Sequence, residues 1–271
     1  MADMTMHPEY EKLIAEIGEL KNQISALLAE RAELQFHTCK NIEADYMVKI
    51  GMLEYKAFEF YCKTLRIKRK IELIRSKLNR QEVVVLPLIE QQLDKEYAEY
   101  EQTLHDRMDT INDAIHRAGL TELSKEDTAL LKKLYRQIVK KLHPDLNPDV
   151  SESELDLFRN AVAAYENADL AIIKSIAIIV DEITPGASDF GLFDGLAELR
   201  AKKEKYLESQ ADILAQIDRI KNSFPYDQLD LLEDDTAVKI LRNELKMEIE
   251  EARKTYQQYE TQLKTMLEGG C

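Results

Sequence analysis

Apolar residues recur in the first third of the chain at alternating steps of four and three, which is the spacing of a heptad repeat. The same rhythm returns, with bulkier side chains, from Ile50 to Leu78. Each stretch predicts a long amphipathic helix whose apolar stripe must be covered by a partner helix, since such a helix is not stable alone. The first seam comprises Leu13, Ile17, Leu20, Ile24, Leu27 and Leu34, with Arg31 at one seam position.

Breaks in this pattern divide the chain into further elements. The tract NRQEVVVLP, 79–87, combines β-branched residues with a proline and predicts a connector. A third helix is expected from about Leu88 to His116, ended by Gly119 as a C′ glycine. Residues 183–195 hold three of the eight glycines and predict a linker, after which amphipathic helices are expected over 196–221 and about 236–267.

The composition agrees with an all-α protein. The chain has 271 residues, of which 32% are charged, and it contains only 8 Gly, 6 Pro and no Trp. We expect long antiparallel coiled-coil helices on either side of a central helical hairpin. The linker lengths are equally compatible with pairing inside one chain and with a parallel dimer of two chains.

The charge and the cysteines narrow the functional classes. A formal net charge of −14 argues against general attraction to nucleic acid or anionic membranes. Cys39, Cys62 and Cys271 lie far apart, which favours neither a disulfide framework nor a zinc site. No apolar run approaches the roughly 20 residues of a membrane helix, and we expect a cytoplasmic protein without membrane contact.

One segment departs from the acidic background. Residues 132–141 contain five basic residues and no acidic one. Ser124 is a candidate N-cap, and Pro144 forces the helix to end at Leu142. By the helical period the basic residues and the apolar residues fall on different faces. A basic stripe alone is usually a solvated face, but this one ends in His143-Pro144-Asp145, and a second amphipathic helix with Phe158, Val162 and Tyr165 follows.

This segment resembles the J-domains of DnaJ-type co-chaperones. Their hallmark is a basic second helix that ends in His-Pro-Asp, followed by an Asn and by a third helix with a spaced Phe and Tyr. The resemblance covers about 121–170 and rests on Tyr135, Arg136, Lys140, Lys141, His143, Pro144, Asp145, Asn147, Phe158, Ala164, Tyr165 and Glu166.

The chain also departs from the family. The Tyr-x-x-Leu-Gly pattern of the family's first helix is absent before Ser124, although residues 111–120 could occupy its place. Leu146 replaces a residue that is often basic. There is neither a Gly/Phe-rich segment nor a zinc-binding repeat, which removes the usual client-binding apparatus of DnaJ.

The resemblance implies a domain organisation and a set of site residues. We expect coiled-coil helices over 8–119, a J-domain-like segment over 120–182, a linker over 183–195 and coiled-coil helices over 196–268. The residues expected to bind the partner are Lys132, Lys133, Tyr135, Arg136, Lys140, Lys141, His143, Pro144, Asp145 and Asn147. The expected core of the J-like segment is Leu131, Leu134, Ile138, Leu142, Phe158, Val162 and Tyr165.

By resemblance, the chain is a co-chaperone that binds a DnaK-type heat-shock chaperone and stimulates its ATPase. Its coiled coils would serve targeting, client binding or homodimerisation. The alternative is a coiled-coil scaffold whose J-like hairpin is structural or only recruits the chaperone. No cofactor or metal is expected, because the histidines lack metal-ligand spacing.

Three other features have competing interpretations. His143 and Asp145 lack a nucleophile or a third group nearby, so an enzyme is not expected. The basic tract 65–80 suits nucleic acid or acidic lipid, but its apolar seam favours a coiled-coil face. The aromatic cluster Tyr55, Phe58, Phe60 and Tyr61 suits either a client or a core, and core packing is the expectation for Phe60.

Overall fold

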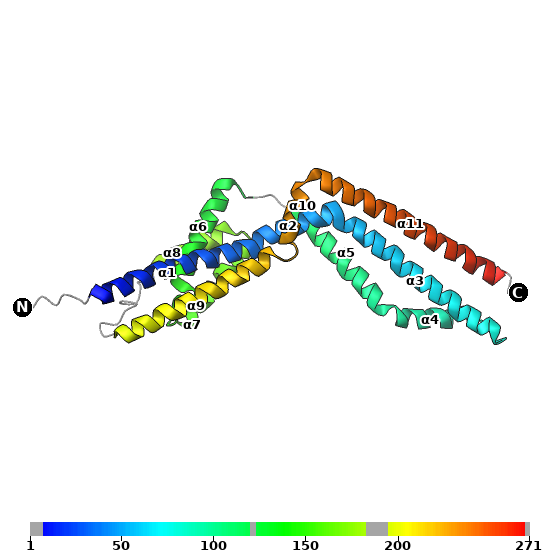
Figure 1. The fold of residues 1–271 in the computed structure, drawn as a ribbon, viewed down its shortest axis with the longest axis horizontal. Coiled ribbons are helices and arrows are strands. Elements are labelled where there is room, and N and C mark those ends of the chain that lie inside the picture. Colours follow the sequence, from blue (N-terminus) through cyan, green and yellow to red (C-terminus); the bar gives the residue numbers. More distant parts are fainter. Residues whose placement is uncertain (1–7, 120–122, 183–194, 269–271) are drawn as a thin grey trace, which may run out of the picture. The chain divides into compact units, whose positions relative to one another are not determined.

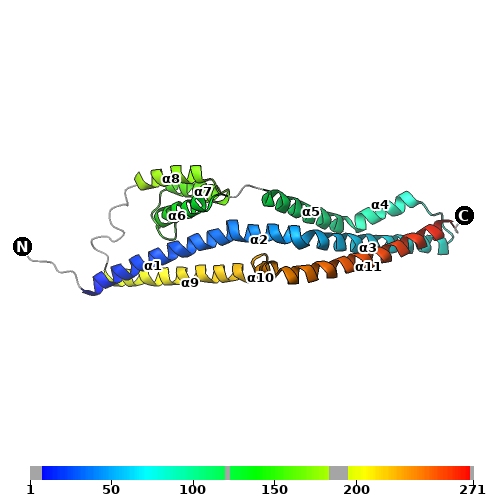
Figure 2. The same ribbon diagram turned by 90° about the horizontal axis from the view of Figure 1, so that it is seen from above.

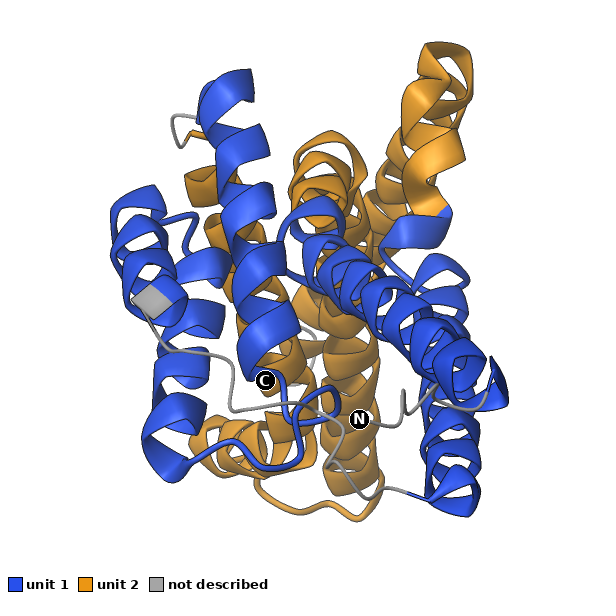
Figure 3. Cartoon of the chain, turned by 90° about the vertical axis from the view of Figure 1, so that its left-hand side faces the viewer, with its two compact units in different colours: residues 1–40, 121–227 blue, residues 41–120, 228–271 orange. Residues whose placement is uncertain are grey.

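The computed structural model describes residues 8–119, 123–182 and 195–268. These residues form helices and no strand, which confirms the all-α prediction. The chain divides into two compact units, residues 1–40 with 121–227 and residues 41–120 with 228–271 (Figure 3). Each unit combines N-terminal and C-terminal pieces and so cuts across the segments expected from the sequence. The expected linker lies outside the described residues, apart from Gly195.

The first unit is built around α1, which is buried on more than one side. Ile24 and Leu28 of α1 are 0% and 2% exposed, and they share one core with Ile138 of α6, Ile173 of α8 and Ile213 of α9. Of the predicted seam, Leu13, Ile17, Leu20 and Ile24 are buried, whereas Leu27 is only partly buried and the neighbouring Leu28 is buried. The helices of this unit are α1 (Pro8–Glu33), the π-helix η1 (Leu34–Thr38), α6 (Lys125–Leu142), α7 (Glu152–Glu166), α8 (Leu170–Glu182) and α9 (Leu196–Lys221).

Helices α1 and α9 lie side by side and run parallel, where antiparallel helices were expected (Figures 1 and 2). Polar contacts between them fix the direction, because residue numbers rise together along both helices. The pairs are Glu9 with Arg200, Glu16 with Lys203, Gln23 with Gln210, and Glu30 with Lys221. Arg31, the polar residue of the seam, donates to Gln216 at 2.6 Å.

The second unit is centred on α3 (Met52–Asn79). This helix packs against one helix that runs parallel to it and against others that run antiparallel to it. Phe60 contacts Tyr256, and Lys68 lies over the ring of Tyr259, so α3 and α11 (Asp235–Glu268) run parallel. The other elements are the π-helix η2 (Met47–Gly51), α4 (Leu86–Glu96), α5 (Ala98–Ala118) and α10 (Leu229–Glu233). Two short elements, α2 (Cys39–Tyr46) and the 3₁₀-helix η3 (Tyr226–Gln228), span the boundaries between the units.

The expected third helix is two helices that return antiparallel to α3. The break is at Tyr97, whose backbone leaves helical geometry and whose hydroxyl donates to the carbonyl oxygen of Leu65 at 3.0 Å. Gly119 ends α5 as its C-cap with φ −89°, so the helix does not use the left-handed conformation expected of a C′ glycine.

The basic tract of α3 is paired with acidic side chains. Arg66 contacts Glu90 and Asp94, and Arg69 contacts Glu96. Hydrogen bonds from Arg69 and Gln92 lower the pKa of the Glu96 carboxyl. Much of the positive charge of this tract is thus compensated within the unit.

The aromatic cluster of α3 lies at its contacts with both neighbouring helices. Phe60 meets Tyr256 of α11 with ring centroids 6.4 Å apart, in agreement with its expected packing role. Phe58 stacks on Tyr61 and lies 4.2 Å from the guanidinium of Arg107 on α5, a cation–π contact.

None of the described helices is both long and apolar enough to cross a membrane.

The burial of α1 predicts a large cost for Ile24→Ala. Removing this fully buried side chain should reduce the free energy of unfolding by about 2–5 kcal/mol, because a cavity remains between α1 and its neighbours. Ile172→Ala on α8, where the side chain is 47% exposed, is the matched control and should change it by less than about 0.5 kcal/mol. Equal losses in urea unfolding would contradict this packing.

Candidate functional site

Helix α6 begins and ends at the residues that the sequence indicated. The hydroxyl oxygen of Ser124 accepts from the backbone N–H of Asp127 at 3.0 Å, and its O–H donates to the Asp127 carboxylate at 2.9 Å. At the other end, His143 is the C-cap with an extended ψ of 128°, and its N–H donates to the carbonyl of Val139. The residue before Pro144 thus leaves helical geometry, as proline requires.

The loop after α6 is held by hydrogen bonds to His143 and to the last turn of the helix. The backbone N–H groups of Leu146 and Asn147 both donate to the carbonyl of His143 at 3.0 Å. The side-chain amide of Asn147 donates to the carbonyl of Lys140 at 3.0 Å, and Leu146 is 1% exposed. Asn147, a predicted partner-binding residue, therefore caps the helix, and Leu146 anchors the loop in the core.

His143, Pro144 and Asp145 differ in exposure. The His143 side chain is 12% exposed and packs edge-on against Phe158, with ring centroids 5.2 Å apart. Its Nδ1 accepts from the backbone N–H of Asp145 at 3.1 Å, which places the proton of the neutral ring on Nε2. Pro144 is exposed, and the Asp145 side chain is 52% exposed. Pro144 and Asp145 are thus exposed, while the His143 ring beside them is held in place by its contacts.

The predicted basic face of α6 is present, although its members differ in their contacts. Lys132, Lys133, Arg136 and Lys140 are all exposed. Lys141 instead pairs with Asp181 of α8 at 2.9 Å. Lys141 is therefore directed away from the other four and ties α6 to α8.

Tyr135 is placed in the core and not on the surface. Its ring is 3% exposed and stacks on Tyr165 of α7 with centroids 3.9 Å apart and an interplanar angle of 11°. Burial raises the pKa of Tyr135 to about 12. The antiparallel α6–α7 hairpin is held by this stack and by the contact between His143 and Phe158.

The expected core residues of this hairpin lie together. Leu131, Ile138, Leu142 and Tyr165 are buried, and Leu134, Phe158 and Val162 are partly buried and pack against the same core.

Helix α1 packs on this hairpin, and sequence reasoning did not predict this contact. The hydroxyl of Ser25, 1% exposed, donates to the backbone carbonyl of Arg136 across the helix–helix contact. Glu33 pairs with Lys132 at 2.9 Å and accepts from the Tyr165 hydroxyl at 2.6 Å. The small residues Ser25, Ala26 and Ala29 on one side of α1 were the sequence signal for a close approach of another helix.

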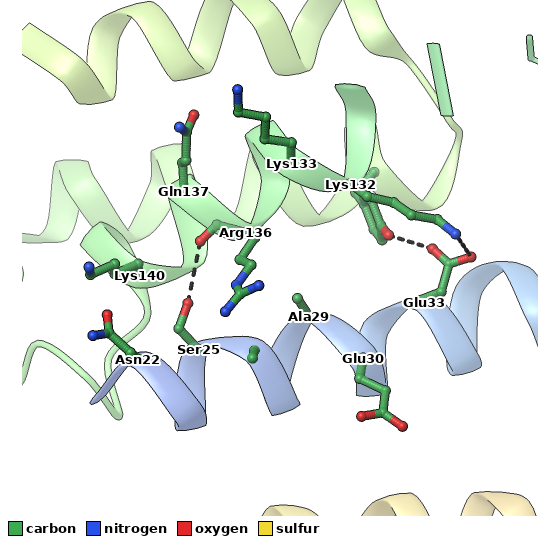
Figure 4. A pocket seen from close by; sticks show the side chains of 12 residues that line it. Asn22, Ser25, Ala29, Glu30, Glu33, Lys132, Lys133, Arg136, Gln137 and Lys140 are labelled. Atoms are coloured by element: carbon green, nitrogen blue, oxygen red, sulfur yellow. Dashed lines mark hydrogen bonds and ion pairs between the residues drawn. The ribbon is translucent and has the colours of Figure 1, made fainter. Parts of the chain in front are cut away.

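A groove of about 530 Å³ lies between α1 and α6 (Figure 4). Small residues of α1 line one wall, and the basic residues of α6 line the other. Figure 4 shows the Arg136 side chain directed towards α1, while Glu30 points away from α6. The lining residues include Asn22, Ser25, Ala26, Ala29, Lys132, Lys133, Arg136 and Lys140.

The other side of the loop faces a second hollow, also of about 530 Å³, between the loop, α1 and α9. Asp145 and Asp149 of the loop line it together with Arg31 of α1 and Lys205 of α9. The hydroxyl of Tyr206 on α9 donates to the carbonyl of Leu146 at 3.4 Å. This hydrogen bond ties the loop to α9.

No family model, curated protein or solved structure matches this chain. The function must therefore be inferred from the residues and geometry of the site.

The burial of His143 predicts a pH-dependent stability. Desolvation lowers the pKa of the His143 imidazole below its ordinary value of 6.5, while the charge of Asp145 opposes this shift. As the pH falls, the unfolded state takes up a proton at His143 before the folded state does. The contribution of the neutral, buried ring to the free energy of unfolding is therefore complete above about pH 6.5 and is lost as the pH falls below that value, towards the lowered pKa of the folded state. His143→Gln should lose stability less steeply between about pH 7 and pH 5 in urea unfolding. Equal slopes for both proteins would contradict this assignment.

The contact with α1 predicts that the segment 120–182 does not fold cooperatively alone. Its core would lack Ile24, Leu28 and Ala32, leaving the part of α6 that faces α1 in water. We expect the isolated fragment to show no cooperative thermal transition by circular dichroism, whereas the full chain does. A fragment that melts as sharply as the full chain would show that α1 is dispensable.

Proposed function

We propose that the chain is a co-chaperone that engages a DnaK-type heat-shock chaperone and stimulates its ATP hydrolysis. The observation that carries the proposal is the exposed basic face of α6, which ends in a structured loop with Pro144 and Asp145 exposed. The resemblance of this segment to J-domains supplies the identity of the partner. The protein itself catalyses no reaction in this proposal.

We further propose that α1 completes the J-like unit. The J-domain family has a first helix before its basic helix, and its sequence pattern is absent here. The half of α1 that contains Ile24 and Leu28 packs on the α6–α7 hairpin and offers a replacement, although it lies about 90 residues upstream in the sequence. The earlier candidate, residues 111–120, belongs to the other compact unit.

Docking would begin with electrostatic attraction. Lys133, Arg136 and Lys140 meet an acidic surface of the chaperone, which raises the association rate and makes binding weaken with salt. Lys132 contributes less, because Glu33 already holds its ammonium group. Pro144 and Asp145 then contact the chaperone, while the buried His143 fixes their position.

The other compact unit is left for targeting. Its parallel α3–α11 pair and antiparallel α4 and α5 suit attachment to a client, to a larger assembly or to a second copy of the chain. Nucleic acid is a weaker candidate, because the basic tract of α3 is compensated by Glu90, Asp94 and Glu96.

The direct test is single-turnover ATP hydrolysis by a purified DnaK-type chaperone. We expect the wild-type chain to accelerate hydrolysis, and His143→Gln to reduce that acceleration by about tenfold or more, about 1.4 kcal/mol in activation free energy. Asp149→Asn, an exposed change in the same loop, is the matched control and should stimulate like the wild type.

Two results would overturn this proposal in different ways. Absence of both binding and stimulation would exclude the chaperone as a partner. Binding without stimulation, unchanged in His143→Gln, would favour the second candidate, a coiled-coil scaffold whose hairpin only recruits the chaperone.

A further inference from the structure

The groove between α1 and α6 contains two carboxylates, and both are held by other partners. Glu33 pairs with Lys132 and accepts the Tyr165 hydroxyl. Glu30 pairs with Lys221, near the C-terminal end of α9, at 2.8 Å. The carboxylates of α1 are thereby kept from the remaining cations of α6.

Three cations of the groove are consequently left uncompensated. Within the described part of the chain, Lys133, Arg136 and Lys140 have no carboxylate at ion-pair distance. These three cations form a local excess of positive charge in a chain of net charge −14. It creates a field that attracts an anionic partner to this groove while the rest of the surface repels it.

The wall opposite these cations is lined by small residues of α1. Ala26 and Ala29 line the groove with their methyl groups, and Figure 4 shows Ala29 beside the Arg136 side chain. An apolar floor with cations on one rim suits Asp and Glu side chains, whose methylenes pack while their carboxylates pair. A phosphate backbone gains nothing from the methyl groups.

We propose that this two-walled groove binds an acidic segment of a protein partner, and that Lys221 keeps it receptive by holding Glu30 away. This inference deepens the proposed function, on which the identity of the partner rests. The parallel pairing of α1 and α9 brings Lys221 to Glu30. Without Lys221, the Glu30 carboxylate competes with the incoming segment for Arg136 and the neighbouring lysines. Lys221 is therefore a positioning residue that acts through Glu30.

The test measures binding of fluorescein-labelled octaglutamate to the full chain by fluorescence polarisation. Lys221→Ala should weaken binding about two- to fivefold, the range of one exposed charge pair. Lys133→Ala and Arg136→Ala should each weaken it by a similar factor. Glu30→Gln alone should bind at least as tightly as the wild type.

The decisive variant is the double change Lys221→Ala with Glu30→Gln. It lacks the α1–α9 ion pair just as Lys221→Ala does, yet it should recover wild-type binding because no free carboxylate remains to compete. If the double variant binds as weakly as Lys221→Ala, Lys221 only supports helix packing and the proposal is overturned. Thermal unfolding of both variants checks that they are equally folded.

Two further arms separate this inference from its alternatives. If a labelled eight-nucleotide single strand binds more tightly than octaglutamate, the ligand of the groove is nucleic acid and not an acidic protein segment. If the groove variants weaken octaglutamate binding but the chain does not stimulate the ATPase, the groove is confirmed as the binding site and the chaperone is excluded as the partner. If the chain stimulates the ATPase but octaglutamate binding is unchanged in the groove variants, the groove is not the binding site, and the proposed co-chaperone function still stands.

Discussion

The contact of α1 with α6 and α7 is the interaction on which the candidate site depends. Ser25 is small enough to let the two helix backbones approach, and Ile24 and Leu28 then fill the space beneath α6. Glu33 adds a polar connection, since it receives both the Lys132 ammonium and the Tyr165 hydroxyl. Without this contact the hairpin would lose one side of its core, and the groove would lose a wall.

The arrangement also explains how an acidic chain presents a cationic site. Acidic residues outnumber basic ones by 14 in the formal charge, yet the two carboxylates that line the groove are already paired. Glu33 is neutralised by Lys132, and Glu30 is neutralised by Lys221 because α9 runs parallel to α1. The charge of the groove is therefore set by helix pairing as much as by the residues of α6.

The local features of the site could be predicted from sequence because they follow from short-range chemistry. Ser124 caps α6, the helix ends before Pro144, and apolar spacing pairs α6 with α7. The direction of α1 and α9 could not be predicted, because a heptad stripe fits a parallel and an antiparallel partner equally well. The break at Tyr97 was also hidden, since the apolar rhythm continues through it.

Position along the chain was a poor guide to the neighbours of the hairpin. The helix that follows it, α8, packs on it, but so does the distant α1, while the residues immediately before it belong to the other compact unit. Similarly, Tyr135 and Asn147 match the family motif, and their structural places are a buried aromatic stack and a helix cap. A motif match selects a segment of the sequence, but burial decides which of its side chains can reach a partner.

Hydrogen exchange of the full chain, with and without an ATP-bound DnaK-type chaperone, tests whether the groove and the loop after α6 bind the chaperone. The chaperone should slow exchange over residues 133–145 and over residues 22–30 of α1 in the same experiment, because both walls of the groove are covered. Protection confined to residues 41–118 or 228–268, or no change in either wall, would contradict the assignment of this groove and loop as the docking site.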